Sequence, residues 1–206
     1  MKLEPVHTSN AAELHEQHAV LLFSDDRNES TKYVNEALRR GQLTVYAPVN
    51  TCNNSTNDAS QHISEIDSEF INYEDNVNSG NLLTLDTKSF YNSALAGNTE
   101  PFEELKMLIE EAIKERIASG KNDEGVTFVS GIAGMLATNE KIDESIDAEK
   151  WWEKTHSEWR QNGLKVTMIC SHPSKIFFDQ SSHQQFMNYK QAMSSLHQIV
   201  VQPSQT

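Results

Sequence analysis

Short apolar segments alternate with longer amphipathic ones along this chain, and this alternation limits the folds open to it more than any other feature. Six segments of strand length are largely apolar on both faces, which is typical of strands buried between two layers of helices. These segments are residues 19–23, 43–47, 82–85, 126–129, 164–170 and 199–201.

The segments between these runs carry the periodicity of amphipathic helices. The clearest has apolar side chains every three or four residues from Phe102 to Ile117 and is expected to begin near Thr99 and Pro101 and to end at Gly120. Three more helices are expected at 33–38, 148–161 and 185–196. Strands that alternate with helices predict parallel pairing. We therefore predict one α/β domain over residues 1–206, with a core at about 14–202. Its fold is expected to be a three-layer α/β/α sandwich around a mostly parallel sheet.

The net charge and the cysteine content of the chain limit the classes of partner and the cellular compartment that we expect for it. The formal net charge of -13 disfavours direct contact with nucleic-acid phosphates. Cys52 and Cys170 lie far apart and do not form a disulfide framework, and the first ten residues lack the apolar region of a secretory signal. No apolar run is long enough to cross a bilayer. A cytoplasmic protein without membrane contact is expected.

Ligands of open parallel sheets bind beyond the carboxyl ends of the strands. The loops expected there are 24–28, 48–60, 86–89, 130–138 and 171–178. A phosphate-binding loop after the first strand would need glycines and a lysine, but residues 24–30 read Ser-Asp-Asp-Arg-Asn-Glu-Ser. This P-loop position is degenerate, so we predict that the chain is not an ATPase. The plain interpretation of the segment is a capped helix start.

Two further loops contain candidate ligand-binding residues. Ser130, Gly131 and Met135 follow the fourth strand, where the glycine permits either close approach of a ligand or an ordinary turn. Cys170 and His172 close the fifth strand and are expected to point the same way. The aromatic group Trp151, Trp152 and Trp159 is expected to pack a helix on the sheet, with a pocket or partner surface as the alternative.

The same histidines also raise the alternatives of a metal site and of a nucleophilic cysteine. Cys170 and His172 together with His18, His183 or His197 could form a metal site, but the paired close spacings of a structural zinc motif are missing. A nucleophilic Cys170 would need a base and an orienting group that the sequence does not establish. No metal, no cofactor and no enzymatic activity are predicted.

The order of several motifs resembles the methanogen/methylotroph sensory (MEDS) domain family, whose fold is related to RecA-type and circadian-clock-type ATPase cores. The matching segments are 17–23, 38–46, 81–85, 89–91 with 96–97, 127–131, 152–159, 168–170 and 196–200. Two positions depart from the family. Residues 132–135 lack its acidic residue before Met135, and His172 stands where an aromatic residue is usual.

The resemblance implies a sensory role in signal transduction, with a small organic compound as the ligand. We therefore expect a stand-alone regulatory domain that binds a small ligand and signals through contacts with a partner protein; a homo-oligomer is left open. The alternative is a non-catalytic, ATPase-like scaffold that acts through protein–protein interaction. The expected ligand-binding residues are His18, Ser130, Gly131, Met135, Cys170 and His172.

Overall fold

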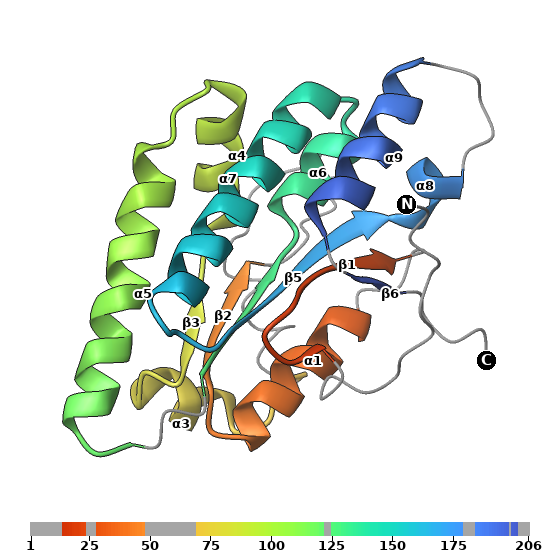
Figure 1. The fold of residues 1–206 in the computed structure, drawn as a ribbon. Coiled ribbons are helices and arrows are strands. Elements are labelled where there is room, and N and C mark those ends of the chain that lie inside the picture. The colour runs from red at the N-terminus through yellow and green to blue at the C-terminus, as the bar shows by residue number, and fades with distance from the viewer. Residues whose placement is uncertain are drawn as a thin grey trace.

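The structure is a computed structural model that describes residues 14–23, 28–47, 69–121, 125–178, 184–197 and 199–201. Within them, a six-stranded sheet has the order β3-β2-β4-β5-β1-β6, and every neighbouring pair is parallel (Figure 1). The strands are β1 (His18–Phe23), β2 (Leu43–Ala47), β3 (Leu82–Thr84), β4 (Val126–Ser130), β5 (Val166–Pro173) and β6 (Ile199–Val201).

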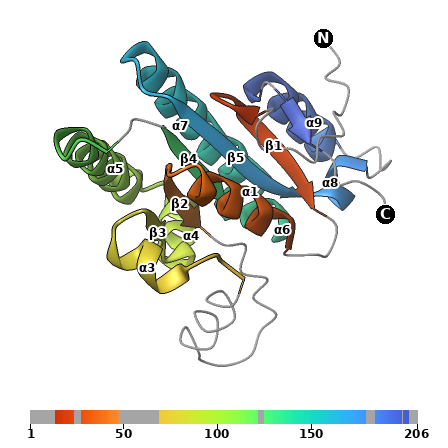
Figure 2. The same cartoon turned by 90° about the horizontal axis from the view of Figure 1, so that it is seen from below.

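Helices cover both faces of this sheet. Figure 2 shows α5, α7 and α9 on one face, with α1 and α3 on the other. The predicted three-layer α/β/α sandwich is therefore confirmed. The helices are α1 (Asn28–Arg39), α3 (Tyr73–Asn78), α4 (Thr87–Leu95), α5 (Glu100–Ala118), α6 (Ile132–Thr138), α7 (Ile142–Gln161), α8 (Ser174–Phe178) and α9 (Gln184–Leu196).

Each face of the sheet has its own apolar core, because successive side chains of a strand point to opposite faces. The core under α5 and α7 contains Phe128 of β4 with Trp152 and Trp159, each about 1% exposed or less. The core under α1 contains Leu21 of β1 and Val34. Trp152 and Trp159 thus pack α7 on the sheet, as predicted, and partly buried Trp151 packs against the same core.

The structure corrects three of the predicted loops. Residues 130–138 hold α6, residues 171–178 hold the end of β5 and α8, and 86–89 hold the start of α4. Asp86 caps α4 by accepting the Lys88 N–H at 3.1 Å. The sequence did not predict these short helices, because one or two helical turns show little periodicity of apolar residues. The predicted loop at 48–60 and most of the one at 24–28 lie outside the described residues.

Longer elements were predicted more closely. Helix α5 runs from Glu100 to Ala118, as its capping residues predicted. Helix α7 begins at Ile142 rather than at Ala148. No helix in the part of the chain that the structure describes is long and apolar enough to cross a membrane.

Gly134 marks the closest approach of α6 to β5, and we predict that it does not tolerate a side chain. A Cβ at this position would lie 2.0 Å from the carbonyl oxygen of Ser171, which is backbone and cannot turn away. Gly134→Ala should therefore lower the free energy of unfolding by about 3 kcal/mol in urea titrations. Gly80→Ala is the control, because Gly80 has open space around it and only its φ of 68° is unfavourable, which costs about 1 kcal/mol. Equal losses in the two variants would contradict the close packing of α6 on β5.

Candidate functional site

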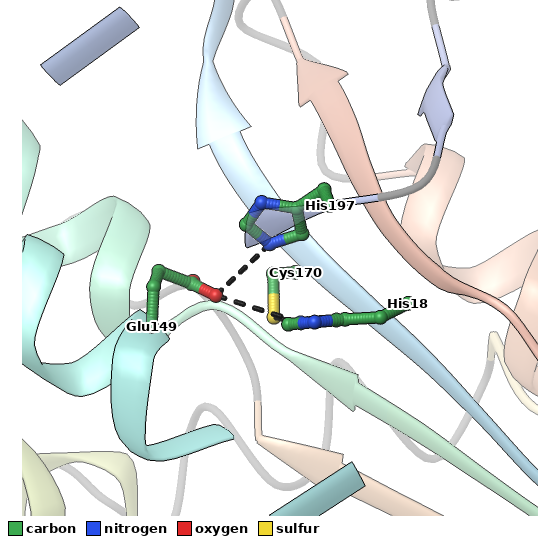
Figure 3. A group of neighbouring side chains, drawn as sticks. All are labelled: His18, Glu149, Cys170 and His197. Atoms are coloured by element: carbon green, nitrogen blue, oxygen red, sulfur yellow. Dashed lines mark hydrogen bonds and ion pairs between the residues drawn. The ribbon is translucent and has the colours of Figure 1, made fainter. Parts of the chain in front are cut away.

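Four ionisable side chains meet in the layer between the sheet and α7. They are His18 at the start of β1, Glu149 of α7, Cys170 of β5 and His197, which follows α9 (Figure 3). Their exposed fractions are 0%, 0%, 1% and 4%. One donor atom from each lies within 4.8 Å of the others. We call these four residues the buried cluster.

Strand pairing and helix periodicity bring the cluster together. The register of β1 on β5 places Val20 beside Cys170 and His18 beside Met168, so His18 and Cys170 point to the same face. His18 Nε2 lies 3.4 Å from Cys170 Sγ. On α7, Glu149 lies on the buried stripe that also holds Trp152. The helix therefore directs this carboxylate into the interior.

The carboxylate of Glu149 is the centre of the cluster. Its Oε2 lies 3.0 Å from His197 Nε2 and 3.6 Å from His18 Nε2. Its other oxygen, Oε1, accepts a hydrogen bond from His172 Nε2 at 2.9 Å. The second ring nitrogen of His172 is hydrogen-bonded to the Tyr189 hydroxyl of α9. One carboxylate thus contacts imidazoles from three separate segments.

Two acceptors outside the cluster orient the rings of His18 and His197. His18 Nδ1 lies 2.6 Å from Oε2 of Glu153, and His197 Nδ1 lies 2.9 Å from the Met193 carbonyl oxygen. Carboxylates and carbonyls only accept, so both Nδ1 atoms carry the hydrogen. Each Nε2 then faces the cluster with a lone pair or with a second proton.

Burial and charge act against each other at these groups. Burial alone would raise the pKa of Glu149, but the surrounding histidines hold it well below its usual range. Burial lowers the pKa of His18, yet hydrogen bonds to Glu149 and Glu153 outweigh it and leave that pKa raised. For His197 burial prevails and the pKa is lowered. Burial and Glu149 raise the pKa of the Cys170 thiol, which is therefore protonated at neutral pH.

The cluster also has the connectivity of a cysteine–histidine–carboxylate triad. Cys170 contacts His18, and His18 contacts Glu153. A nucleophile must be reached by its substrate and must ionise. Cys170 is 1% exposed and its thiol pKa is raised, so the geometry does not favour nucleophilic catalysis. The histidine beside its sulfur is His18, whereas His172 bonds to Glu149 and Tyr189.

The predicted ligand-binding residues divide into two groups. His18 and Cys170 belong to the buried cluster, and His172 contacts it through Glu149. Ser130, Gly131 and Met135 form the junction of β4 with α6. Ser130 is the register partner of Cys170, but its Oγ accepts the Ile132 N–H at 3.3 Å. Gly131 donates its N–H to the Ala47 carbonyl at 2.9 Å, and Met135 is a buried residue of α6.

The position of the cluster differs from the expected one. His18 opens β1 and Cys170 lies within β5, so the cluster lies under α7 and not beyond the carboxyl ends of the strands. Sequence reasoning missed Glu149, although a carboxylate on the inward stripe of an amphipathic helix was a usable signal. His183 and Cys52 lie outside the described residues. Helix α9 brings the chain back to the cluster, where His197 contacts residues that are far from it in sequence. The spacing between neighbouring residues in the sequence does not reveal a contact of this kind.

No family model, no curated protein and no solved structure matches this chain in comparisons with known proteins. The resemblance to the methanogen/methylotroph sensory family therefore stays a prediction from the order of its sequence motifs.

Proposed function

We propose that the chain is a regulatory domain that binds a divalent transition-metal ion, zinc first among them, and signals through contacts with a partner protein. The ligands in this proposal are Nε2 of His18, Oε2 of Glu149, Sγ of Cys170 and Nε2 of His197. The observation that carries it is the spacing of these four donor atoms.

Three of the six spacings agree with the edges of a zinc tetrahedron, and the other three are at most 4.8 Å. Zinc binds nitrogen and oxygen at about 2.0 Å and sulfur at about 2.3 Å, so tetrahedral edges are about 3.3 Å between nitrogen and oxygen and about 3.5 Å between nitrogen and sulfur. The two nitrogen–oxygen distances here are 3.0 and 3.6 Å, and the nitrogen–sulfur distance is 3.4 Å. An ion placed between the donors would need little rearrangement of the chain.

The directions of the histidine lone pairs also support a metal ion at this site. Because His197 donates Nδ1–H to the Met193 carbonyl, a neutral ring turns its Nε2 lone pair toward Glu149 Oε2 at 3.0 Å. Two lone pairs at this distance repel unless a second ring proton or a metal cation lies between them, and a neutral ring leaves that place to the metal. His18 repeats the arrangement with Glu153 as the outer acceptor. Histidine ligands of metals commonly donate their other N–H to a carboxylate or a backbone carbonyl, which fixes the coordinating nitrogen.

Charge favours a divalent ion of borderline softness. A metal-bound cysteine is a thiolate, so Glu149 and Cys170 would supply two negative charges and the two histidines none. A divalent cation makes this buried set neutral, which avoids the high cost of an unpaired buried charge. Thiolate and imidazole donors suit zinc, whereas magnesium and calcium prefer oxygen ligands.

The same geometry disfavours an organic ligand and a catalytic metal at this place. Donor atoms within hydrogen-bond distance of one another leave no room for an organic molecule among them. Four protein ligands fill the coordination sphere of zinc, whereas catalytic zinc sites keep one position open for water or substrate. A regulatory or structural ion fits a closed site of this kind.

The test is the stoichiometry of metal binding. Chelator-treated protein should take up one zinc ion per chain in native mass spectrometry, and cobalt(II) should give the thiolate-to-cobalt absorption of a tetrahedral site. Cys170→Ser should lose this absorption and most of the affinity, because a hydroxyl is a poor ligand for zinc. The matched control is Ser171→Ala, which alters the next residue of β5, on its opposite face, where the Ser171 hydroxyl has no hydrogen-bond partner among the described residues. A chain that takes up no metal, or binds it equally well as Cys170→Ser, would refute the proposal.

A metal-free result would favour the alternative of a non-catalytic scaffold. Helix α5 offers one observation for it, since Met107, Leu108 and Ile117 are 61%, 52% and 52% exposed. Met107 and Leu108 are adjacent, and contiguous exposed apolar surface is typical of protein–protein contacts. The scaffold reading requires only that such contacts form, and it assigns no ligand to the buried cluster.

A further inference from the structure

We infer that metal occupancy controls the docking of α9 and β6 on the rest of the domain. This inference rests on the proposed function and names the element through which the site would act. Helix α9 and β6 are the last two elements described along the chain, and His197 lies between them. Any movement that carries α9 away from the core therefore removes one of the four ligands.

Two polar tethers lead from this unit to Glu149, and Tyr189 of α9 is also hydrogen-bonded to Ser145 of α7. His197 reaches Glu149 Oε2 directly. Tyr189 of α9 reaches the other oxygen, Oε1, through His172. The two tethers approach one carboxylate from the same helix, so the orientation of Glu149 and the position of α9 are linked.

The remaining attachments of the unit are limited in extent. Strand β6 has three residues, lies at the edge of the sheet and pairs with β1. On α9, Tyr189 and Met193 are fully buried in a small apolar cluster beside Ile142 of α7. Edge strands and elements with small apolar contacts open at lower free energy than the centre of a domain. The other ligands lie on α7 and on β1 and β5, which are both flanked by strands on either side.

Mass action then sets the direction of the effect. A metal that loses His197 on opening binds the docked state more tightly than the opened one, so it shifts the population toward docking. At a free zinc concentration of 100 times the dissociation constant, opening of α9 and β6 should become rarer by up to about a hundredfold, the limit being the ratio of the two affinities. Loss of the metal reverses the shift, so the unit would report occupancy to a partner.

Amide hydrogen exchange tests this inference on the full chain. Zinc added to chelator-treated protein should slow exchange in α9 and β6 by up to about a hundredfold. Amides of α5, which lies on the same face but contributes no ligand, should change much less. If α9 and α5 slow to the same extent, the unit does not open separately and the inference is wrong.

Two variants, each lacking one histidine ligand, separate the effect of zinc on the docking of α9 from zinc binding itself. His197→Leu and His18→Leu each remove one histidine ligand and are compared at equal zinc saturation. Zinc should still slow exchange in α9 when His18 is replaced, because His197 remains bound to the ion. It should no longer do so when His197 is replaced. Where a leucine variant does not fold, the glutamine variant at that position takes its place.

Three results can then be told apart. No zinc uptake by the unaltered chain contradicts the proposed function itself. Zinc uptake without slower exchange in α9 contradicts only the coupling. Equal slowing in the two histidine variants would show that His197 does not transmit occupancy, which also overturns the inference.

Discussion

Zinc should raise the melting temperature of the chelator-treated protein by on the order of 10 °C. A ligand that binds only the folded state stabilises it by about 4 kcal/mol at 1,000 times its dissociation constant, and a chain of about 200 residues gains roughly 2–4 °C for each kcal/mol. The measurement is differential scanning calorimetry of one preparation across a zinc titration. The melting temperature should keep rising with free zinc after the site is full, as mass action requires.

The control for this experiment is to replace zinc with other divalent ions. Magnesium and calcium at the same concentrations should leave the melting temperature unchanged, because they prefer oxygen donors and the cluster supplies two nitrogens and one sulfur. An equal rise with all three ions would indicate binding to the acidic surface of this chain, which carries a net charge of -13. That outcome would count against the buried cluster as the binding site.

The second large effect is expected from Glu149→Ala in the metal-free protein. Glu149 lies at 0% exposure and is the shared partner of His18, His172 and His197. Removing one partner of a buried ionic group leaves the others unsatisfied and typically costs about 3–5 kcal/mol. Urea unfolding in the presence of chelator measures the loss directly, since no metal then contributes.

Glu153→Ala is the matched control on the same helix. Like Glu149, Glu153 forms an ion pair with His18. Its side chain is 30% exposed, however, so water can replace part of the hydrogen bonding that Glu153 provides. The loss should therefore be smaller, about 1 kcal/mol. If the two variants lose the same stability, Glu149 is not the residue that holds the cluster together.

The sheet was predictable because its strands are apolar on both faces. Residues 43–47 and 199–201 coincide with β2 and β6 as the structure describes them, and α5 begins and ends where its caps indicate. Helices α6 and α8 were not predicted, since they are short and α6 is buried almost all round, which removes the polar face that marks an amphipathic helix.

The site was only half predictable. His18, Cys170 and His172 were singled out as candidates, and the structure places them together around Glu149. The role of Glu149 could not be inferred, because a sequence does not reveal which strand an inward carboxylate faces. Motif rules find metal sites whose ligands are close in sequence. Here the proposed ligands come from four segments, so the strand order and the packing of α7 and α9 are both needed to bring them together.

The strand order also determines when this domain can be completed during synthesis. Strand β1 ends at residue 23 and lies between β5 and β6 in the sheet, which begin only at residues 166 and 199. An emerging chain must keep this apolar strand unpaired until residues 166–173 have left the ribosome, which at about 5–20 residues per second takes many seconds. Such a strand invites aggregation or chaperone binding in the meantime. His197 is the last of the four proposed ligands to be synthesised, so the proposed metal site can be completed only after residue 197 has left the ribosome.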